Sequence, residues 1–152
     1  MNIMQESDSI VIIPTYNEME NIEKIIRAVL GLEKNFHILV IDDNSPDKTG
    51  DEVERLIKTE FGGRLFIVHR SGKLGLGTAY IQGFKWALEH GYDYIFEMDA
   101  DFSHDPNDLP RLYAACHDEG YDLAIGSRYV SGVNVVNWPI GRVLMSYFAS
   151  KY

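Results

Sequence analysis

Residues 94–106 read YIFEMDADFSHDP. The first part, Tyr94 to Met98, is short and largely apolar, which is typical of a buried strand. Asp99 and Asp101 follow it directly, where this central strand is expected to end. Because ligands of open α/β sheets bind at the carboxyl ends of the strands, the stretch predicts a strand that carries two carboxylates into a ligand site.

The two aspartates favour a metal site. Carboxylates at adjoining positions repel one another unless a cation lies between them. Oxygen ligands suit Mg²⁺ or Mn²⁺, which takes its other ligands from water and substrate phosphates. The alternative is that both are turn or cap residues, since Asp is common in turns. Asp105 and Pro106 already provide a helix cap and a first-turn proline, so a cap does not require Asp99 and Asp101.

The composition indicates one domain over residues 1–152, with residues 1–8 as a disordered tail. The formal net charge of −9 argues against a broad surface for nucleic acid, although a small phosphorylated ligand could bind through a metal. Cys116 is the single cysteine, so no intrachain disulfide is expected, and its helical pattern indicates a core residue. We find no signal peptide and no apolar run that could span a bilayer, and we expect a cytoplasmic protein.

Apolar runs and helical periodicities alternate along the rest of the chain. Further strands are expected at Ser9–Ile13, His37–Ile41, Arg64–His69 and, as a short fifth strand, Leu123–Ile125. Helices are expected at Glu20–Leu32, from Thr49, from Ala79 to about His90, at Pro106–Glu119 and from Ile140 to Tyr152. Thr49 and Glu52 fit a capping box. The alternation predicts an α/β fold, a Rossmann-like sandwich whose mostly parallel sheet is flanked by helices.

The turns after the first two strands carry side chains that a turn does not need. Tyr16 follows the first strand, and its ring could stack on a nucleobase. Asp43 follows the second strand, where an acid can accept hydrogen bonds from a ribose or from a base N–H. A solvated acidic turn is the alternative for Asp43.

Residues 70–79 read RSGKLGLGTA and precede a helix. The glycines permit close approach of the backbone, the helix N-terminus offers free N–H groups, and Arg70 and Lys73 add positive charge. The pattern alone is weak evidence, because it follows the third strand and lacks the third glycine of a dinucleotide site. A tight turn into a helix is the alternative. Arg128, after the predicted fifth strand, is of the residue type best suited to a phosphate.

Several segments are recognisable together: PTYNE at 14–18, DDNSPD at 42–47, KLGLGTA at 73–79, MDADFSH at 98–104 and GSRY at 126–129. In this order and spacing the chain resembles, from Ile10 to Ser146, the polyprenol- and dolichol-phosphate mannosyltransferases, which are inverting family 2 glycosyltransferases with the GT-A fold. The resemblance implies GDP-mannose as donor, a lipid monophosphate as acceptor and Mg²⁺ or Mn²⁺ as cofactor. It also implies membrane contact through segments after Tyr152, and hence a peripheral position at the cytoplasmic membrane face.

The resemblance implies roles for individual residues. Pro14, Tyr16, Glu18, Ile41 and Asp43 would line the guanosine site; Lys73, Ala79 and Arg128 would contact the donor; and Asp99, Ala100 and Asp101 would face the diphosphate and sugar. Asp101 would be the main metal ligand, with Asp99 and Ser103 as further ligands, and Asp99 and Asp101 would carry catalysis. Ser103 stands where some relatives place a Gln ligand, so the metal shell is expected to differ here.

The mannosyl transfer that this resemblance implies needs no side chain to act as a base. A lipid phosphomonoester is largely ionised at neutral pH, since its second pKa is about 6. Two alternatives remain: another family 2 transferase with a donor such as UDP-glucose, and a non-catalytic nucleotide-binding module. A dehydrogenase is disfavoured, because the turn after the first strand is not glycine-rich.

Overall fold

The computed structural model describes residues 6–127 and 139–149. Its strands are β1 (Ser9–Thr15), β2 (His37–Asp42), β3 (Leu65–His69) and β4 (Tyr94–Glu97). Its α-helices are α1 (Ile22–Leu30), α2 (Thr49–Leu56), α3 (Leu76–Glu89), α4 (Leu109–His117) and α5 (Ile140–Ala149). A π-helical turn, η1 (Ile57–Phe61), follows α2, and a 3₁₀ turn, η2 (Pro106–Asp108), precedes α4.

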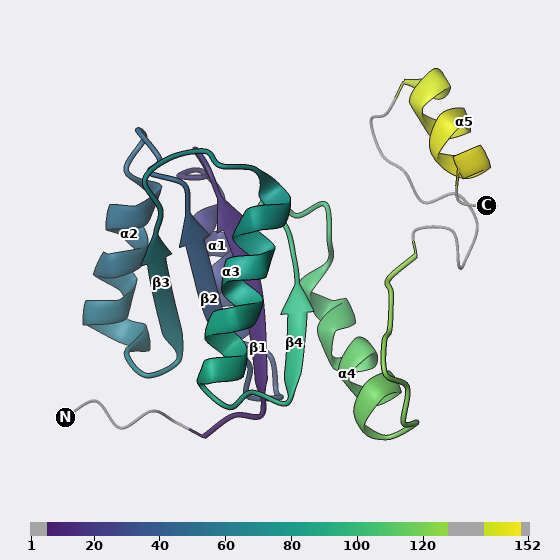
Figure 1. Ribbon diagram of the computed structural model, residues 1–152, viewed down its shortest axis with the longest axis horizontal. Helices are drawn as coiled ribbons and strands as arrows, with labels where there is room; N and C mark the ends of the chain where they lie inside the picture. The colour runs from purple at the N-terminus through teal and green to yellow at the C-terminus, as the bar shows by residue number, and fades with distance from the viewer. Residues whose placement is uncertain (1–5, 128–138, 150–152) are drawn as a thin grey trace.

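The strands form one parallel sheet in the order β3-β2-β1-β4 (Figure 1). Ile10 of β1 pairs with His37 of β2 on one side and with Ile95 of β4 on the other. The carboxyl ends of all these strands therefore lie at the same edge of the sheet. The predicted parallel α/β sheet is confirmed. However, β4 lies at an edge of the described sheet rather than at its centre, because no described segment pairs with its outer side.

Helices cover both faces of the sheet, with α3 on one face and α1 and α2 on the other (Figure 1). Val11 and Ile13 of β1 pack in the core shared with α1 and α2, whereas Ile10 and Ile12 pack in the core shared with α3. Successive residues of a strand point to opposite faces, so a strand covered on both sides is apolar throughout. This explains the continuous apolar run at the start of the chain.

Helix α3 approaches β1 closely at Gly83. A Cβ built at this residue would lie 2.7 Å from Cγ2 of Ile12, whose side chain is fully buried. Only glycine allows the helix to lie this near the strand. The contact anchors α3 on the sheet, and the glycine-rich loop that precedes α3 is thereby held near the strand ends.

The predicted fifth strand is wrong. Residues 123–125 have no strand conformation in the structure, and Leu123 and Ile125 are 74% and 79% exposed. A strand needs backbone hydrogen bonds from a neighbouring strand, and a run of three apolar residues does not supply this partner by itself. The apolar run is present, but its pairing is not.

The predicted capping box at the start of α2 is also wrong. Lys48 precedes the helix with a left-handed backbone (φ 69°) and makes no capping bond with its side chain, whereas the Asp47 carboxylate accepts from the Thr49 N–H at 3.0 Å. Thr49 is the first helical residue and is fully buried. Its hydroxyl accepts a hydrogen bond from the backbone N–H of Glu18 at 3.0 Å, so it links the turn after β1 to the start of α2.

The last residues of the expected N-terminal tail are bonded to the domain. The Asp8 carboxylate contacts the Lys34 ammonium at 2.8 Å and accepts a hydrogen bond from the Tyr113 hydroxyl at 2.7 Å. Partial burial raises the pKa of Asp8, but hydrogen bonds from Lys34, Ser9 and Tyr113 outweigh that effect and lower the pKa to about 2. The domain therefore includes residue 8, whereas residues 1–5 lie outside the described part.

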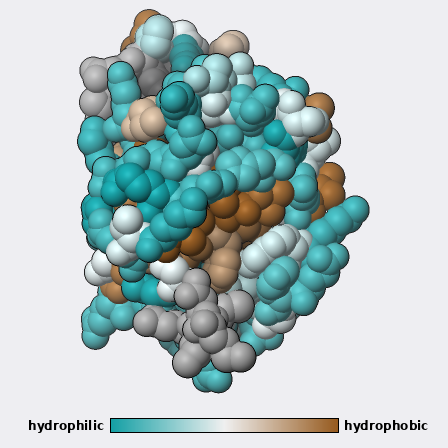
Figure 2. Space-filling view, turned by 90° about the vertical axis from the view of Figure 1, so that its left-hand side faces the viewer, coloured by the Kyte–Doolittle hydropathy of each residue, from teal (hydrophilic) through white to brown (hydrophobic). Residues whose placement is uncertain are grey.

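The edges of the sheet differ from its centre. Most side chains of β3 are partly exposed, and Figure 2 shows an apolar band flanked by polar surface on the side of β3 and α2.

The helix expected from Ile140 is present as α5, whose Ile140, Met145 and Phe148 are strongly exposed. None of the helices within the described residues is both long enough and apolar enough to cross a membrane.

Candidate functional site

The carboxyl ends of β1, β2 and β4 meet at a cavity of about 210 Å³. Its lining includes most of the residues that the sequence predicts for a site: Pro14, Tyr16, Glu18, Asp43, Lys73, Ala79, Asp99, Ala100 and Asp101, together with Thr15 and Leu76. These residues come from four separate segments of the chain. The parallel sheet brings them together because each segment lies at the end of a strand or at the start of α3, at the same edge.

Two predicted site residues lie elsewhere, and a third falls outside the described part of the chain. Ile41 is fully buried in the core shared with α3, so its side chain does not line the cavity. Ser103 lines a neighbouring groove, and its backbone N–H donates to Oδ1 of Asp101 at 2.9 Å. Arg128 lies outside the described residues.

Asp42 organises the side of the cavity formed by β1 and β2. It is only 2% exposed, and it accepts hydrogen bonds from the Thr15 hydroxyl at 2.9 Å, the Ser45 hydroxyl at 2.6 Å and the Ser45 N–H at 3.0 Å. A buried carboxylate with this many donors holds the turn in one conformation. Asp42 is therefore structural.

Side chains of the turn after β2 also bind the turn after β1. The Asn17 N–H donates to the Ser45 hydroxyl at 3.1 Å, and the Met19 N–H donates to the Asp47 carboxylate at 3.1 Å. Asn17 has a left-handed backbone (φ 59°), which Asn tolerates better than most residues. These bonds fix the backbone that directly follows Tyr16.

Asp43 faces the cavity and contacts a buried arginine behind it. Nε of Arg70 lies 2.9 Å from Oδ1 of Asp43, and the side chains are 3% and 10% exposed. Sequence reasoning noted the charge of Arg70 but did not place it in the site. The available signal was its position directly after β3, next to the strand end that carries Asp43.

Tyr16 and Lys73 form the open mouth of the same side. Tyr16 is 39% exposed, and the Lys73 ammonium lies over its ring, 4.7 Å from the ring centroid. A cation over an aromatic face is a favourable contact. It also shows that the loop before α3 reaches the ring at the end of β1.

The side of the cavity that follows β4 is more open. Asp101 is exposed, and hydrogen bonds from the side chain and backbone of Ser103 lower the pKa of Asp101. Asp99 accepts a 3.3 Å hydrogen bond from the Tyr80 hydroxyl. Phe102 has a left-handed backbone (φ 60°), which is strained for a bulky residue.

The donor set fits a hard divalent cation. The cavity is lined by the carboxylates of Glu18, Asp43, Asp99 and Asp101, against the single ammonium of Lys73. An anionic ligand could enter such an acidic space only with a cation to bridge the like charges. Among the described residues, no three His, Cys, Asp or Glu side chains gather as a complete protein shell. Such a shell is not required for Mg²⁺ or Mn²⁺, which commonly takes one or two carboxylates, water and substrate phosphates.

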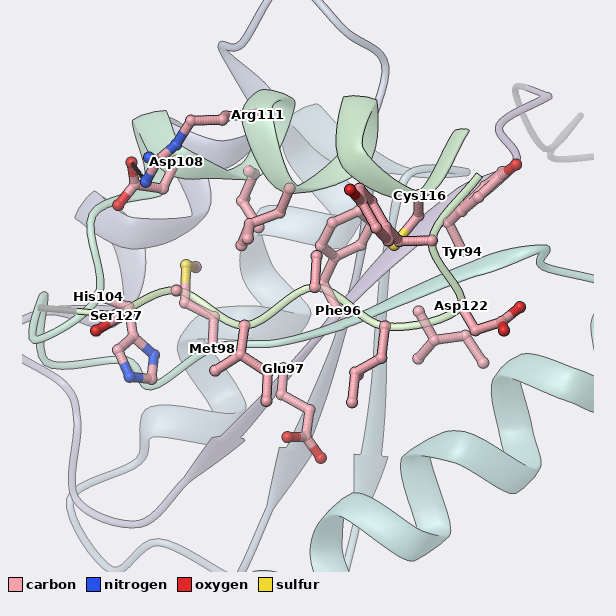
Figure 3. Close-up of a pocket in the computed structure, with 18 of the residues that line it drawn as sticks. Tyr94, Phe96, Glu97, Met98, His104, Asp108, Arg111, Cys116, Asp122 and Ser127 are labelled. Carbon is pink, nitrogen blue, oxygen red and sulfur yellow. Dashed lines mark hydrogen bonds and ion pairs between the residues drawn. The ribbon is translucent and has the colours of Figure 1, made fainter. Parts of the chain in front are cut away.

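A larger groove of about 1540 Å³ adjoins this side of the cavity. It lies between β4, α4 and residues 120–127, and Asp99 and Ser103 are among the residues that line it. Figure 3 shows Phe96 and Met98 within it and the charged residues Asp108, Arg111 and Asp122 around them. The open edge of β4 thus leaves space next to the aspartates.

Known proteins are similar to this chain in sequence and in fold. The sequence profile of glycosyl transferase family 2 matches residues 10–151. The chain is 49% identical over 144 residues to a polyprenol monophosphomannose synthase of Mycolicibacterium smegmatis, covering 95% of this chain and 54% of that protein. It is 45% identical over 143 residues to an undecaprenyl-phosphate mannosyltransferase of Micrococcus luteus, covering 94% and 57%. The chain thus spans about half the length of these curated relatives.

Solved structures agree. The mannosyltransferase PcManGT from Pyrobaculum calidifontis, in complex with GDP-Man and Mn²⁺, aligns with a TM-score of 0.50 at 26% identity, over 53% of this chain and 24% of that one. S. aureus TarS aligns with a TM-score of 0.59 at 24% identity, over 72% and 32%, which shows the fold alone. The fold is that of the GT-A glycosyltransferases. With a family profile that covers nearly the whole chain, this protein belongs to glycosyl transferase family 2.

Proposed function

We propose that this chain is the nucleotide-sugar-binding part of a polyprenyl-phosphate mannosyltransferase, which moves a mannosyl group from GDP-mannose to a polyprenyl or dolichyl monophosphate. One observation carries the proposal. A single cavity joins Tyr16 and Asp43, at the ends of β1 and β2, to Asp99 and Asp101, which follow β4. Membership of family 2 and the names of the relatives from M. smegmatis and M. luteus support it.

The two sides of the cavity suit the two parts of the donor. Tyr16 offers an aromatic face on which a nucleobase can stack. Asp43 offers a carboxylate that accepts hydrogen bonds from base N–H groups. The guanosine would therefore bind between the ends of β1 and β2, and its diphosphate would extend toward Asp99 and Asp101.

Asp99 and Asp101 would hold Mg²⁺ or Mn²⁺. Their oxygen donors suit this type of ion, and the Mn²⁺ complex of PcManGT supports the assignment. When bound, such an ion supplies Lewis-acid stabilisation of the negative charge on a leaving diphosphate. The Ser103 N–H fixes the Asp101 carboxylate, and Tyr80 donates to the Asp99 carboxylate, so both side chains are partly oriented without a ligand.

The transfer is a displacement at the anomeric carbon with inversion. An oxygen of the acceptor phosphate forms the new bond to this carbon. The bond from the carbon to the β-phosphate oxygen breaks, and GDP leaves with the electron pair. The acceptor is already ionised near neutral pH, so no side chain has to remove a proton. The task of the protein residues is to bind and orient the donor. Because the acceptor is a lipid, we place the protein at the periphery of a membrane, on its cytoplasmic face.

Calorimetric titration tests this function at the level of donor binding. We expect GDP-mannose to bind in the presence of Mn²⁺ and to bind at least about tenfold more weakly after chelation of the metal. UDP-glucose should bind more weakly than GDP-mannose. A preference for UDP-glucose would instead indicate a different family 2 transferase.

The matched variants are Asp101→Ala and Asp93→Ala. Asp93 is an exposed aspartate directly before β4, at the opposite end of the sheet. We expect Asp101→Ala to abolish the metal-dependent part of donor binding and Asp93→Ala to leave it unchanged. Equal affinity in the Asp101→Ala variant and the unmodified protein would remove Asp101 from the site.

A further inference from the structure

Residues 99–104 form a loop after β4 that is anchored at both ends. Before it, Met98 is buried, and its N–H donates to the carbonyl of Ile12 at 3.1 Å, which continues the pairing of β1 and β4. After it, Pro106 is buried at the start of η2. The two aspartates proposed to hold the cation lie within this loop, so its conformation decides how they are presented.

Two hydrogen bonds close the loop on itself. Across its base, the Asp99 N–H donates to Nδ1 of His104 at 3.2 Å. Near its tip, the Ser103 N–H donates to Oδ1 of Asp101 at 2.9 Å. Between these bonds, Phe102 has a left-handed backbone (φ 60°). A bulky residue keeps such a conformation only where the surrounding structure imposes it. The Asp101 side chain is exposed, but the backbone that carries it is therefore held.

The bond across the base fixes which nitrogen of His104 carries hydrogen. A backbone N–H only donates, so Nδ1 of His104 accepts with its lone pair, and the hydrogen of the neutral ring is on Nε2. His90 shows the opposite arrangement. Its Nδ1 lies 2.7 Å from the carbonyl oxygen of Trp86, which only accepts, so there Nδ1 carries the hydrogen. These two exposed histidines therefore differ in tautomer.

Stability of the fold does not account for His104. The residue is exposed, its side chain lines the groove beside the cavity (Figure 3), and neither core cluster of the described residues includes it. Exposed side chains contribute little to the free energy of unfolding. Side chains that bond to metal-ligating residues, by contrast, orient those residues and commonly change metal affinity by about 10- to 100-fold.

We propose that His104 is a positioning residue that clips residues 99–104 closed, and so holds Asp99 and Asp101 ready for a divalent cation before the donor binds. The inference rests on the proposed function, which assigns the cation to these aspartates. A loop that is already closed needs less ordering when the cation and the diphosphate arrive. His104 is not itself a ligand in this arrangement, because Nδ1 uses its lone pair to accept the Asp99 N–H and Nε2 carries the hydrogen.

Calorimetric titration of GDP into the full chain, first with Mn²⁺ and then after chelation, separates the effect of the metal from that of the nucleotide. His104→Leu removes the acceptor of the Asp99 N–H. We expect it to lower the GDP affinity in the presence of Mn²⁺ about tenfold and to leave the affinity after chelation unchanged. A residue that only stabilised the fold would instead lower the melting temperature and weaken GDP binding equally under both conditions.

Two further variants sharpen the titration. His104→Asn should restore the Mn²⁺-dependent affinity to within about twofold of that of the unmodified protein, because the amide oxygen can accept the Asp99 N–H in place of Nδ1. His90→Leu is the matched control, since His90 is also exposed and also bonds a main-chain group of a nearby residue. It should leave both GDP affinities unchanged.

Nitrogen NMR of the imidazole rings tests the geometry without any ligand. At a pH of about 8, above the ordinary histidine pKa of about 6.5, His104 should show a hydrogen on Nε2 and none on Nδ1. His90 should show the reverse. The signals are assigned by their loss in His104→Asn and His90→Leu.

Two results would overturn the inference alone: an unchanged Mn²⁺-dependent affinity in His104→Leu, or a hydrogen on Nδ1 of His104. If GDP binding by the unmodified protein does not depend on Mn²⁺, the proposed metal site fails, and this inference fails with it. The two failures are distinguishable, because the first is seen only in the variant or the ring spectrum and the second already in the titration of the unmodified protein.

Discussion

The two sides of the cavity are built differently. On the side of β1, β2 and β3, Asp42 is 2% exposed and accepts several hydrogen bonds, and Asp43 is 7% exposed beside Arg70. On the side of β4, Asp101 is exposed and Asp99 accepts one long bond from Tyr80. The aspartates of this sheet edge therefore range from buried and bonded within the fold to exposed, with Asp101 bonded only by Ser103 among the described residues.

The difference matches the two tasks proposed for the site. Recognition of a base gains affinity from a pocket that is already formed, because less ordering is needed on binding. A cation and a diphosphate bring their own charges and can order open carboxylates. The hydrogen bonds thus produce a rigid side, which suits the nucleobase, and an open side, which suits the cation and the diphosphate.

The largest expected effect is a difference in the free energy of unfolding between substitutions on the two sides of the cavity. Asp42→Ala should lower the free energy of unfolding by about 3 kcal/mol, because it leaves buried donors of Thr15 and Ser45 unpaired. Asp101→Ala should change it by less than about 0.5 kcal/mol, since exposed side chains contribute little. Urea unfolding followed by circular dichroism measures both. Equal losses in the two variants would contradict the contrast between the sides.

A smaller loss in the free energy of unfolding is expected at Thr49, which links the turn after β1 to the start of α2 on the rigid side of the cavity. Thr49→Val keeps the shape of the buried side chain but removes the oxygen that accepts from the Glu18 N–H. We expect a loss of about 1.5 kcal/mol in the free energy of unfolding. Thr59→Val, at an exposed position in η1, is the matched control and should be near neutral. Unchanged stability of Thr49→Val would mean that this bond does not hold the turns together.

The Asp8 carboxylate lies outside the cavity and allows the pH dependence of the unfolding free energy to be compared with that of the site. The pKa of Asp8 is lowered to about 2, so its contribution is present above its ordinary pKa and is lost as the pH falls from about 4 to about 2. Asp8→Asn should remove about 1 kcal/mol near neutral pH, allowing for its partial exposure, and should flatten the pH dependence of unfolding in that interval. Asp93→Asn should leave the slope intact. The same slope in Asp8→Asn as in the unmodified protein would show that other carboxylates cause it.

The smallest expected effect lies on the open side. Burial, together with the charges of Asp99 and Glu97, raises the pKa of Tyr80, so the hydroxyl remains a donor at ordinary pH. Tyr80→Phe removes a single 3.3 Å bond to Asp99. Affinity for GDP with Mn²⁺ should fall only about twofold, corresponding to less than 0.5 kcal/mol. A loss of tenfold or more would mean that the open side is more organised than its exposure indicates.

The sequence by itself predicted the parallel sheet, the helices that cover it and most of the residues that line the cavity. Apolar runs followed by polar turns are local patterns, and parallel strands place all such turns at one edge. Ile10 to Ile13 and Asp99 to Asp101 could therefore be assigned without coordinates. The same local reasoning failed for Leu123–Ile125, because a strand exists only with a partner that the local pattern does not identify.

Only the tertiary structure showed that Asp42, Asp43 and Arg70 differ in burial and in the partners that they contact. Side chains alternate between the faces of β2, so Ile41 packs against α3, while Asp42 is turned to the other face, where its Oδ2 lies near Gly50 of α2. Asp43 then reaches the cavity and Arg70 is buried behind it. Adjacent identical residues cannot be told apart by composition or spacing, because burial and bonding depend on which neighbours the folded sheet brings to each side chain.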